Sequence, residues 1–202
     1  MVLQLMLWLY RKLSFLLLGE ELSKTLRSFR NSIGTVIEID DALPKFLKAR
    51  MDDCPKFWVQ THWQKRKGWR PNDQIFFDAH YSFILWTRKG SEEFAVASIA
   101  FDPFGFSGIC IRQIQGKQGY GKYLGSIKWE RLLIAVVHRW ARAQNIRNIH
   151  IISARLSDYY NYERHGSMYL RYDVTARRMG LKLNPLTQIY GSRTSRLKLA
   201  TP

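Results

Sequence analysis

The stretch that decides the fold runs from Gly108 to Ser153 and reads GICIRQIQGKQGYGKYLGSIKWERLLIAVVHRWARAQNIRNIHIIS. Residues 108–114 and 148–153 are apolar and rich in isoleucine, which predicts two buried strands. Between them, a glycine-rich turn at 116–121 leads into residues 126–143, where apolar side chains recur at helical spacing on one face. A strand, a helix and a second strand in this order form a βαβ crossover, so the two strands should be parallel.

The residues before this crossover predict an antiparallel meander. Residues 81–87 and 94–101 have strand-like patterns, and turn residues at 89–91 and 102–105 connect them to each other and to the strand at 108–114. A helix at 20–33 has one apolar face and ends at Gly34, and a last helix at about 170–179 ends at Gly180. Residues 58–70 mix tryptophan with basic residues, which fits a nucleic-acid contact or a loop that packs its indoles on the domain.

Together these elements predict an α+β fold in three layers. Its central mixed sheet contains an antiparallel meander followed by a βαβ crossover, and helices precede it. The chain has 202 residues, which is a length typical of one domain. We expect a helical arm at 1–34 packed on the domain or on a partner, a folded domain at 35–185 and a C-terminal tail at 186–202.

The N-terminal residues 1–18 form an apolar run that Arg11 and Lys12 interrupt. The run is too short and too charged to span a membrane, so we expect a helix covered by the domain or a partner, or a peripheral membrane contact. The two cysteines, Cys54 and Cys110, are far apart and have no disulfide-framework or zinc spacing. These features predict a reduced, cytoplasmic protein without a structural metal.

Positive charge is concentrated in the C-terminal half of the chain. The net charge is +16, and residues 112–202 contain 17 lysines and arginines against four acidic residues. This balance predicts a polyanionic partner, either nucleic acid or an anionic membrane surface, or a cofactor that carries phosphate. A basic surface that only aids solubility is the alternative.

The glycine turn between the strand and the helix is the candidate anion site. Glycines allow the backbone to approach phosphate oxygens, and N–H groups at a helix start favour negative charge. A turn that needs glycine only for its geometry has the same pattern. The candidate cofactor-binding residues are Ile114, Gly116, Lys117, Gln118, Gly119, Tyr120, Gly121 and Lys122.

The order of these elements, the glycine turn and the helix end at Met179-Gly180-Leu181 resemble the Gcn5-related N-acetyltransferase superfamily over about residues 80–184. The resemblance implies that acetyl-CoA or another acyl-CoA is the cofactor. Its pyrophosphate is expected at the turn and its pantetheine arm between the strands at 108–114 and 148–153. In the superfamily, this turn reads Gln or Arg, then any two residues, then Gly, then any one residue, then Gly or Ala. In register with Gly119 and Gly121, the position of Gln or Arg is Gly116. In register with Gln113 and Gly116, the last small residue is replaced by Gln118, so neither register fits fully.

The resemblance also implies a tyrosine four residues before the glycine that ends the last helix, as general acid toward the leaving thiolate. That position is Ala176, so Tyr172, one turn earlier, is the candidate. A general base must take the proton of the acceptor amine. Asp158 and His165 are the candidates, because loops after parallel strands often form the sites of α/β proteins. Two titratable residues of the long helix are expected to face solvent: Glu130 and His138.

The sequence therefore predicts an acyl-CoA-dependent N-acyltransferase-like protein with a small or macromolecular amine as its acceptor. The alternative is a catalytically degenerate protein of the same fold. Its basic C-terminal half would contact nucleic acid or an anionic membrane.

Overall fold

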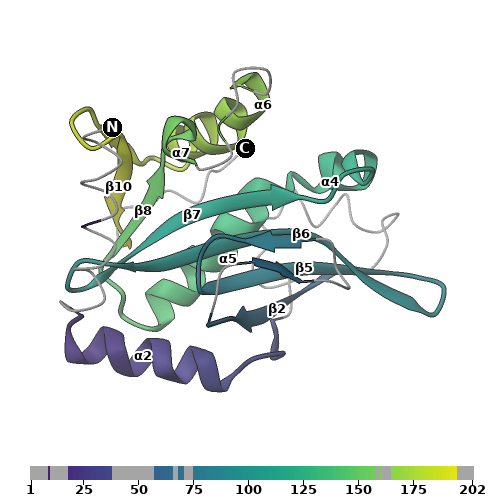
Figure 1. Ribbon diagram of the computed structural model, residues 1–202, viewed down its shortest axis with the longest axis horizontal. Coiled ribbons are helices and arrows are strands. Elements are labelled where there is room, and N and C mark those ends of the chain that lie inside the picture. The colour runs from purple at the N-terminus through teal and green to yellow at the C-terminus, as the bar shows by residue number, and fades with distance from the viewer. Residues whose placement is uncertain are drawn as a thin grey trace.

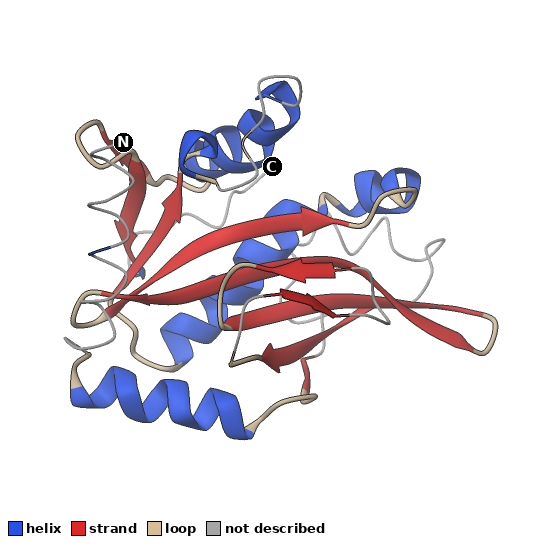
Figure 2. Cartoon of the chain, in the orientation of Figure 1, coloured by secondary structure: helices blue, strands red, loops and turns tan. Residues whose placement is uncertain are grey.

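The computed structural model describes residues 9, 18–37, 57–65, 68–70, 75–157, 160 and 165–194. Within these residues, eight strands form one sheet in the order β1-β2-β5-β6-β7-β8-β10-β9, and β3 and β4 form a separate hairpin (Figures 1 and 2). The strands are β1 (Val36–Ile37), β2 (Phe57–Trp63), β3 (Gly68–Arg70), β4 (Ile75–Phe77), β5 (Tyr81–Lys89), β6 (Glu92–Phe104), β7 (Gly108–Gly116), β8 (Asn148–Ile152), β9 (Lys182–Asn184) and β10 (Ile189–Arg193).

The described helices fall into three groups along the chain. The helix α2 (Glu20–Asn31) precedes the sheet, and α4 (Gly121–Ile127) and α5 (Trp129–Ala143) form the crossover. After β8 and the 3-10 turn η1 (Ala154–Leu156), a continuous C-terminal helix contains three parts. These are α6 (His165–Tyr169), the π-helical segment η3 (Leu170–Val174) and α7 (Thr175–Arg178). In Figure 1, α5 lies behind β7, and α6 and α7 lie above it.

The sheet has the predicted mixed topology. Strands β2, β5, β6 and β7 pair antiparallel in sequence order, and β7 pairs parallel with β8. The predicted α+β fold, with an antiparallel meander followed by a βαβ crossover, is therefore confirmed. Gly180 ends the C-terminal helix with a φ of 79°, and the Gly180 and Leu181 N–H groups bond back to Arg177 and Ala176 as in a Schellman cap.

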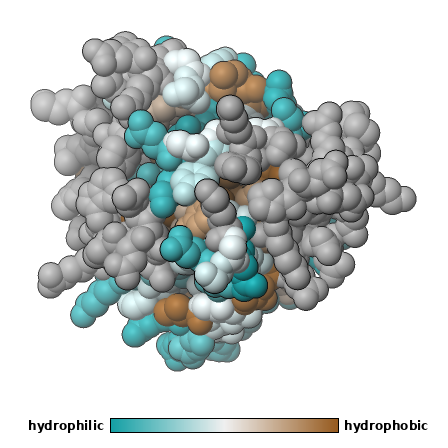
Figure 3. Space-filling model, turned by 90° about the vertical axis from the view of Figure 1, so that its right-hand side faces the viewer, coloured by the Kyte–Doolittle hydropathy of each residue, from teal (hydrophilic) through white to brown (hydrophobic). Residues whose placement is uncertain are grey.

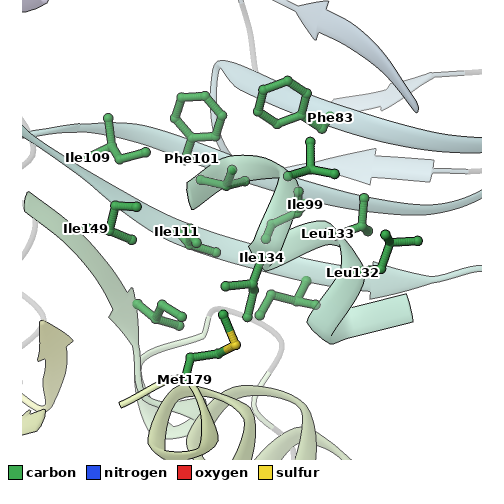
Figure 4. Close-up of a cluster of buried hydrophobic side chains, with 14 of the residues drawn as sticks. Phe83, Ile99, Phe101, Ile109, Ile111, Leu132, Leu133, Ile134, Ile149 and Met179 are labelled. Atoms are coloured by element: carbon green, nitrogen blue, oxygen red, sulfur yellow. The ribbon is translucent and has the colours of Figure 1, made fainter. Parts of the chain in front are cut away.

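The helices α2 and α5 pack against one face of the sheet. Phe29 of α2 meets Phe83, Phe101 and Trp140 edge-to-face, with ring centroids 5.1–5.6 Å apart. Figure 4 shows the apolar side chains of β5, β6, β7 and β8 pointing toward α5, with Met179 closing the cluster from the C-terminal helix. This core holds β7 and β8 in place and so positions the segments that follow them.

The opposite face of the sheet carries the residues around the β3–β4 hairpin. The buried side chains of Ile75, Phe77 and Ala79 pack there against Ile84 and Ala100. The loop from 78 to 80 therefore lies over β5 and β6, on the side of the sheet away from α5.

Three predictions about local structure are wrong. The turn expected at 102–105 begins later, because β6 continues to Phe104 and the turn occupies 105–107, with Gly105 at a φ of 64°. Part of the segment 58–70 forms β2, an inner strand, where an indole-packing loop was expected. Residues 189–193 of the expected tail form β10 between β8 and β9. The predicted division into arm, domain and tail otherwise stays a prediction.

Among the described helices, none is long and apolar enough to cross a membrane. Apart from Leu9 and Leu18, the N-terminal run 1–18 lies outside the described residues, and so do residues 195–202. The predicted peripheral membrane contact through residues 1–18 therefore stays a prediction.

His150 gives the fold a testable dependence on pH. Its ring packs on Phe104 of β6 and against Gly191 of β10, and burial lowers its pKa to about 4. Between pH 6.5 and 4 the unfolded chain binds a proton that the folded protein does not, so stability falls as the pH falls through this window. Between pH 7 and pH 4, the free energy of unfolding should fall in both proteins. The fall should be smaller in His150→Gln than in the unmodified protein, by up to about 3 kcal/mol.

Urea unfolding at pH 7, 5.5 and 4 measures this difference. Between pH 7 and 8 the two proteins should show the same pH dependence, which is the internal control. Parallel stability curves at every pH would contradict the assignment.

Candidate functional site

The candidate site begins where β7 leaves β8. The parallel pairing extends only from Gly108 with Asn148 to Ile111 with Ile151. On the other side, β6 pairs Phe101 with Ile111 but Ala100 with Gln113, so Arg112 is an extra residue in a bulge. From Arg112 onward, the edge of β7 that faced β8 needs other hydrogen-bond partners.

The hydroxyl of Tyr172 provides those partners. The Ile114 N–H donates to the Tyr172 oxygen at 3.0 Å, and the Tyr172 hydroxyl donates to the Arg112 carbonyl at 3.3 Å. Tyr172 is only 2% exposed. Burial raises its pKa well above the ordinary value for tyrosine, and the nearby charge of Asp78 raises it further. Tyr172 is therefore a neutral phenol that completes the backbone hydrogen bonding of β7.

The π-helical segment η3 is what presents Tyr172 to β7. Tyr172 and the next residue, Asp173, are both buried, and both are anchored in the protein interior. Asp173 accepts hydrogen bonds from the Ala154 N–H and the Tyr190 hydroxyl, each at 2.9 Å. Wide π turns inside helices occur frequently at functional sites. Here the wide turn directs two consecutive side chains inward, one to β7 and one to the end of β8.

The glycine turn follows directly after β7. Gly116 is required for packing, since a Cβ there would lie 3.0 Å from the Trp129 ring and 3.2 Å from Leu124. Gly119 has a φ of 89°, which disfavours other residues. At Gly119 and Gly121 a Cβ would meet no atom within 4 Å, so the space beside both residues is open.

The polar groups of this turn can meet an anion. The Lys117 N–H bonds to Val96 at 2.7 Å, and its ammonium lies 5.4 Å from the Tyr120 ring centroid. Within the described residues, no backbone carbonyl outside α4 accepts from the N–H groups of Gln118, Gly119 or Gly121. These N–H groups and the Lys117 ammonium have the donor chemistry that a phosphate needs.

The predicted long helix is broken just after this turn. Lys128 adopts a left-handed conformation with a φ of 49°, which separates α4 from α5. Glu130, expected in solvent, is instead half-buried in the first turn of α5, where burial raises its pKa while its own N–H and Arg171 oppose that shift. Arg171 lies over the Trp129 ring, with 5.6 Å to the centroid, and donates to the Ile114 carbonyl at 3.4 Å.

The structure brings several of the predicted site residues together. Tyr172 contacts Ile114, and the turn 116–121 continues from the same strand. Asp158 lies outside the described residues, His165 begins α6 with its side chain outside them, and Lys122 lies in α4 with its side chain likewise outside them. The expectation that His138 faces solvent is wrong. It is buried, and its Nε2 lies 2.7 Å from the Thr194 carbonyl.

Sequence reasoning missed a second polar group beside this site. Asp78 is 3% exposed, and its N–H donates to the Gln113 side chain at 3.3 Å. Two residues later, His80 Nδ1 lies 2.8 Å from a carboxylate oxygen of Asp102. The available signal was the pair of titratable residues Asp78 and His80 directly after three apolar residues. Interpreting Asp102 as a turn residue concealed its pairing with His80.

Comparison with known proteins gives no family assignment. No protein-family model and no curated protein matches the chain. Among solved structures, a domain from Methanocaldococcus jannaschii matches at 16% identity and a TM-score of 0.35, covering 56% of this chain and 66% of that one. A cAMP-binding acyltransferase variant from Mycobacterium smegmatis matches at 9% identity and a TM-score of 0.39, covering 85% of this chain and 50% of that one. This chain thus spans less than two thirds of either structure, and TM-scores below 0.5 establish no shared fold.

Replacing Tyr172 tests its place in the sheet. Tyr172→Phe removes the hydroxyl but keeps the ring, leaving the buried Ile114 N–H and Arg112 carbonyl unpaired there. We expect the free energy of unfolding to fall by about 1–3 kcal/mol, measured by urea denaturation.

Tyr169→Phe is the matched control, because it is the same substitution on the same helix and its hydroxyl accepts a hydrogen bond from the exposed Arg177. It should change stability by about 0.5 kcal/mol or less. Equal stability of Tyr172→Phe and the unmodified protein would contradict the hydrogen-bonding role.

Proposed function

We propose that the protein binds an acyl-CoA and transfers its acyl group to an amine. The observation that carries this proposal is the parting of the parallel strands β7 and β8 after Ile111, at the end of β7 that runs into the glycine turn. A backbone edge that leaves its partner strand offers N–H and carbonyl groups to an amide-bearing ligand. The resemblance of the element order to the Gcn5-related N-acetyltransferases supports the same function by fold analogy.

The residues of the turn fit the phosphate end of an acyl-CoA. The open space at Gly119 and Gly121 admits close approach, and the N–H groups of Gln118, Gly119 and Gly121 supply donors. Lys117 and Lys122 supply positive charge. The acyl-CoA, when bound, supplies an activated thioester. In this proposal the chain holds it at the turn, and Ile114 lies beside its arm.

The catalytic residues belong to the same proposal. Tyr172 is the proposed general acid, because its phenol stays protonated and lies at the point where β7 leaves β8. An arm that entered between the two strands would take over the hydrogen bonds of its hydroxyl and release it toward the ligand. Asp158 and His165 remain proposed general bases.

Cofactor binding can be measured through thermal stability. If the dissociation constant is about 10 μM, 1 mM acetyl-CoA stabilises the protein by about 2.7 kcal/mol, which raises Tm by roughly 5–10 °C. Lys117→Glu should weaken binding at least about tenfold, because it places a negative charge beside the phosphates.

Lys182→Glu is the matched control. It makes the same change of charge at an exposed position of β9, and it should leave the Tm shift unchanged. Absence of a shift with acetyl-CoA, with a long-chain acyl-CoA and with free CoA would overturn the proposal.

The charged surface favours a second candidate, a catalytically degenerate module that binds nucleic acid. Among the described residues from 94 to 194, the carboxylates are Asp102 and Asp173, both buried, and Glu130, half-buried. Nine cations of this part are exposed: Lys128, Arg139, Arg142, Arg147, Arg155, Arg177, Arg178, Lys182 and Arg193. Of the others described, Arg112 is buried, and Lys117, Arg131 and Arg171 are half-buried. Figure 3 shows one side of the molecule, on which hydrophilic and neutral colours separate small brown groups.

Arginine predominates over lysine among these cations, and its planar guanidinium suits phosphodiesters. Under this candidate Tyr172 only completes the sheet, and Ala176 stands where a catalytic tyrosine was expected. We propose nucleic acid as the partner of this surface and treat binding to anionic vesicles as the competing outcome.

Fluorescence anisotropy with a labelled 20-base-pair DNA tests the second candidate. We expect binding at 50 mM salt that weakens at least about a hundredfold by 200 mM, because several phosphate contacts release counterions. The double variant Arg142→Glu with Arg147→Glu should lose at least tenfold in affinity.

The double variant Arg27→Glu with Arg88→Glu is the control. It changes the net charge by the same amount at exposed positions outside this surface, and its affinity for DNA should fall less than threefold. No binding to DNA, or binding only to vesicles rich in phosphatidylserine, would overturn this candidate.

A further inference from the structure

The loop of residues 78–80 places two acid–base groups over the sheet. Its chain leaves β4 at Phe77 and enters β5 at Tyr81, and the buried Phe77 and Ala79 pack on the sheet face away from α5. Asp78 bonds through its N–H to Gln113 of β7, and His80 contacts Asp102 of β6. The loop thus bridges β6 and β7, the two strands whose pairing contains the bulge at Arg112.

His80 and Asp102 have the geometry of a histidine–carboxylate dyad. His80 Nδ1 lies 2.8 Å from Oδ1 of Asp102, and the His80 backbone N–H donates to the same oxygen at 2.9 Å. The Asp102 side chain is 8% exposed and that of His80 is 28% exposed. Two contacts to one buried carboxylate fix both the backbone and the ring of His80, while part of the ring faces outward.

This contact selects the tautomer of the imidazole. An ionised carboxylate can only accept, so the nitrogen facing Asp102 carries the proton. In the neutral ring the lone pair is then on Nε2, the nitrogen away from Asp102. A histidine oriented in this way is suited to accept a proton from a substrate.

The loop that carries His80 contacts β7, the strand that borders the proposed acyl site. Asp78 is near enough to Tyr172 for its charge to raise the pKa of that phenol, and its N–H is bonded to Gln113, the residue after the bulge. Two residues of chain reach at most about 7 Å, so the backbone of His80 lies within that distance of Asp78. The same three-residue loop therefore connects the vicinity of Tyr172 with the dyad.

We propose that His80, oriented by Asp102, is the general base that removes the proton from the acceptor, in place of Asp158 or His165, and that the acceptor is a primary amine. An amine arrives as an ammonium ion, and the carboxylates of Asp78 and Asp102 provide the negative charge that attracts it. His80 is the catalytic residue of this pair and Asp102 its positioning residue. The inference rests on the proposed acyltransferase function.

The chemical step balances without any further reactant. The ammonium ion first releases one proton to solvent through Nε2 of His80. The nitrogen of the resulting neutral amine then forms a bond to the thioester carbon, and the bond from that carbon to sulfur breaks. The proton of the nitrogen passes to Nε2 of His80, and the departing sulfur takes a proton from Tyr172 or from solvent. The products are an amide and a thiol, and no oxidant or metal is consumed.

Chemical modification provides a readout separate from turnover. Diethyl pyrocarbonate acylates neutral imidazoles, and peptide mass spectrometry measures the rate at each of the five histidines. We expect His80 to react at least about tenfold faster than the buried His138, and saturating acetyl-CoA to slow its reaction at least threefold. The reaction at His80 should also slow in Asp102→Asn, where the carboxylate charge is lost.

Kinetic variants test the role of each residue. Release of thiol from acetyl-CoA is measured with ethanolamine as the acceptor probe. We expect His80→Ala to lower kcat about 10²–10⁴-fold, with acetyl-CoA binding unchanged, and added imidazole to restore part of the loss. Asp102→Asn should lower kcat by a smaller factor, and Glu93→Gln, on the exposed β5–β6 hairpin, should have no effect.

The outcomes separate the two proposals. If acetyl-CoA gives no thermal shift, the acyltransferase function fails, and the role of His80 falls with it. A second outcome is that acetyl-CoA binds but does not slow the modification of His80, and that His80→Ala keeps its turnover. In that case the dyad only anchors the loop, and this inference is wrong. Loss of turnover that imidazole cannot rescue, together with unprotected His80, also overturns it.

Discussion

The structure depends on one requirement, which is that β7 must leave β8 after four paired residues without leaving its backbone unbonded. An unpaired N–H or carbonyl in the interior costs about as much as a lost hydrogen bond. The hydroxyl of Tyr172 meets this requirement at Ile114 and Arg112. The C-terminal helix must therefore present this one oxygen at the edge of β7, and the π-helical segment and the Asp173 contacts hold it there.

Three segments that are distant in the sequence converge around this point. The glycine turn follows β7, the C-terminal helix contributes Tyr172 and Arg171, and the loop 78–80 approaches from the opposite face of the sheet. Each segment is fixed by a different kind of contact: close packing at Gly116, a buried phenol at Tyr172 and a carboxylate at His80. All three segments contact β7 or continue from it.

The fold was largely predictable because its signals are local. Hydrophobic periodicity and turn residues identified the meander, the crossover and the helix end at Gly180. The strand β2 was missed because basic residues follow its tryptophans, and β10 because its five residues include a glycine and a serine. The break at Lys128 has no sequence signal that we recognise, since lysine ordinarily favours a helix.

The candidate site was only partly predictable, because its key contacts join residues far apart in the chain. Tyr172 was selected by its spacing from Gly180, but its bond to Ile114 spans 58 residues, and no local pattern encodes such a contact. The same holds for His80 and Asp102, which are 22 residues apart. Asp102 precedes a proline and therefore has the pattern of a turn, whereas the structure keeps it in β6.

The π-helical segment constrains the length of the C-terminal helix. A π turn holds one residue more than an α turn, and each residue of an α-helix advances by about 100° around its axis. Removing a single residue from Leu170–Val174 would turn the wide π turn into an ordinary α turn. Consecutive side chains would then point about 100° apart, further than in a π turn, which turns Tyr172 and Asp173 away from the positions that reach their buried partners. Natural variation in this region should therefore accept substitutions far more readily than changes of length.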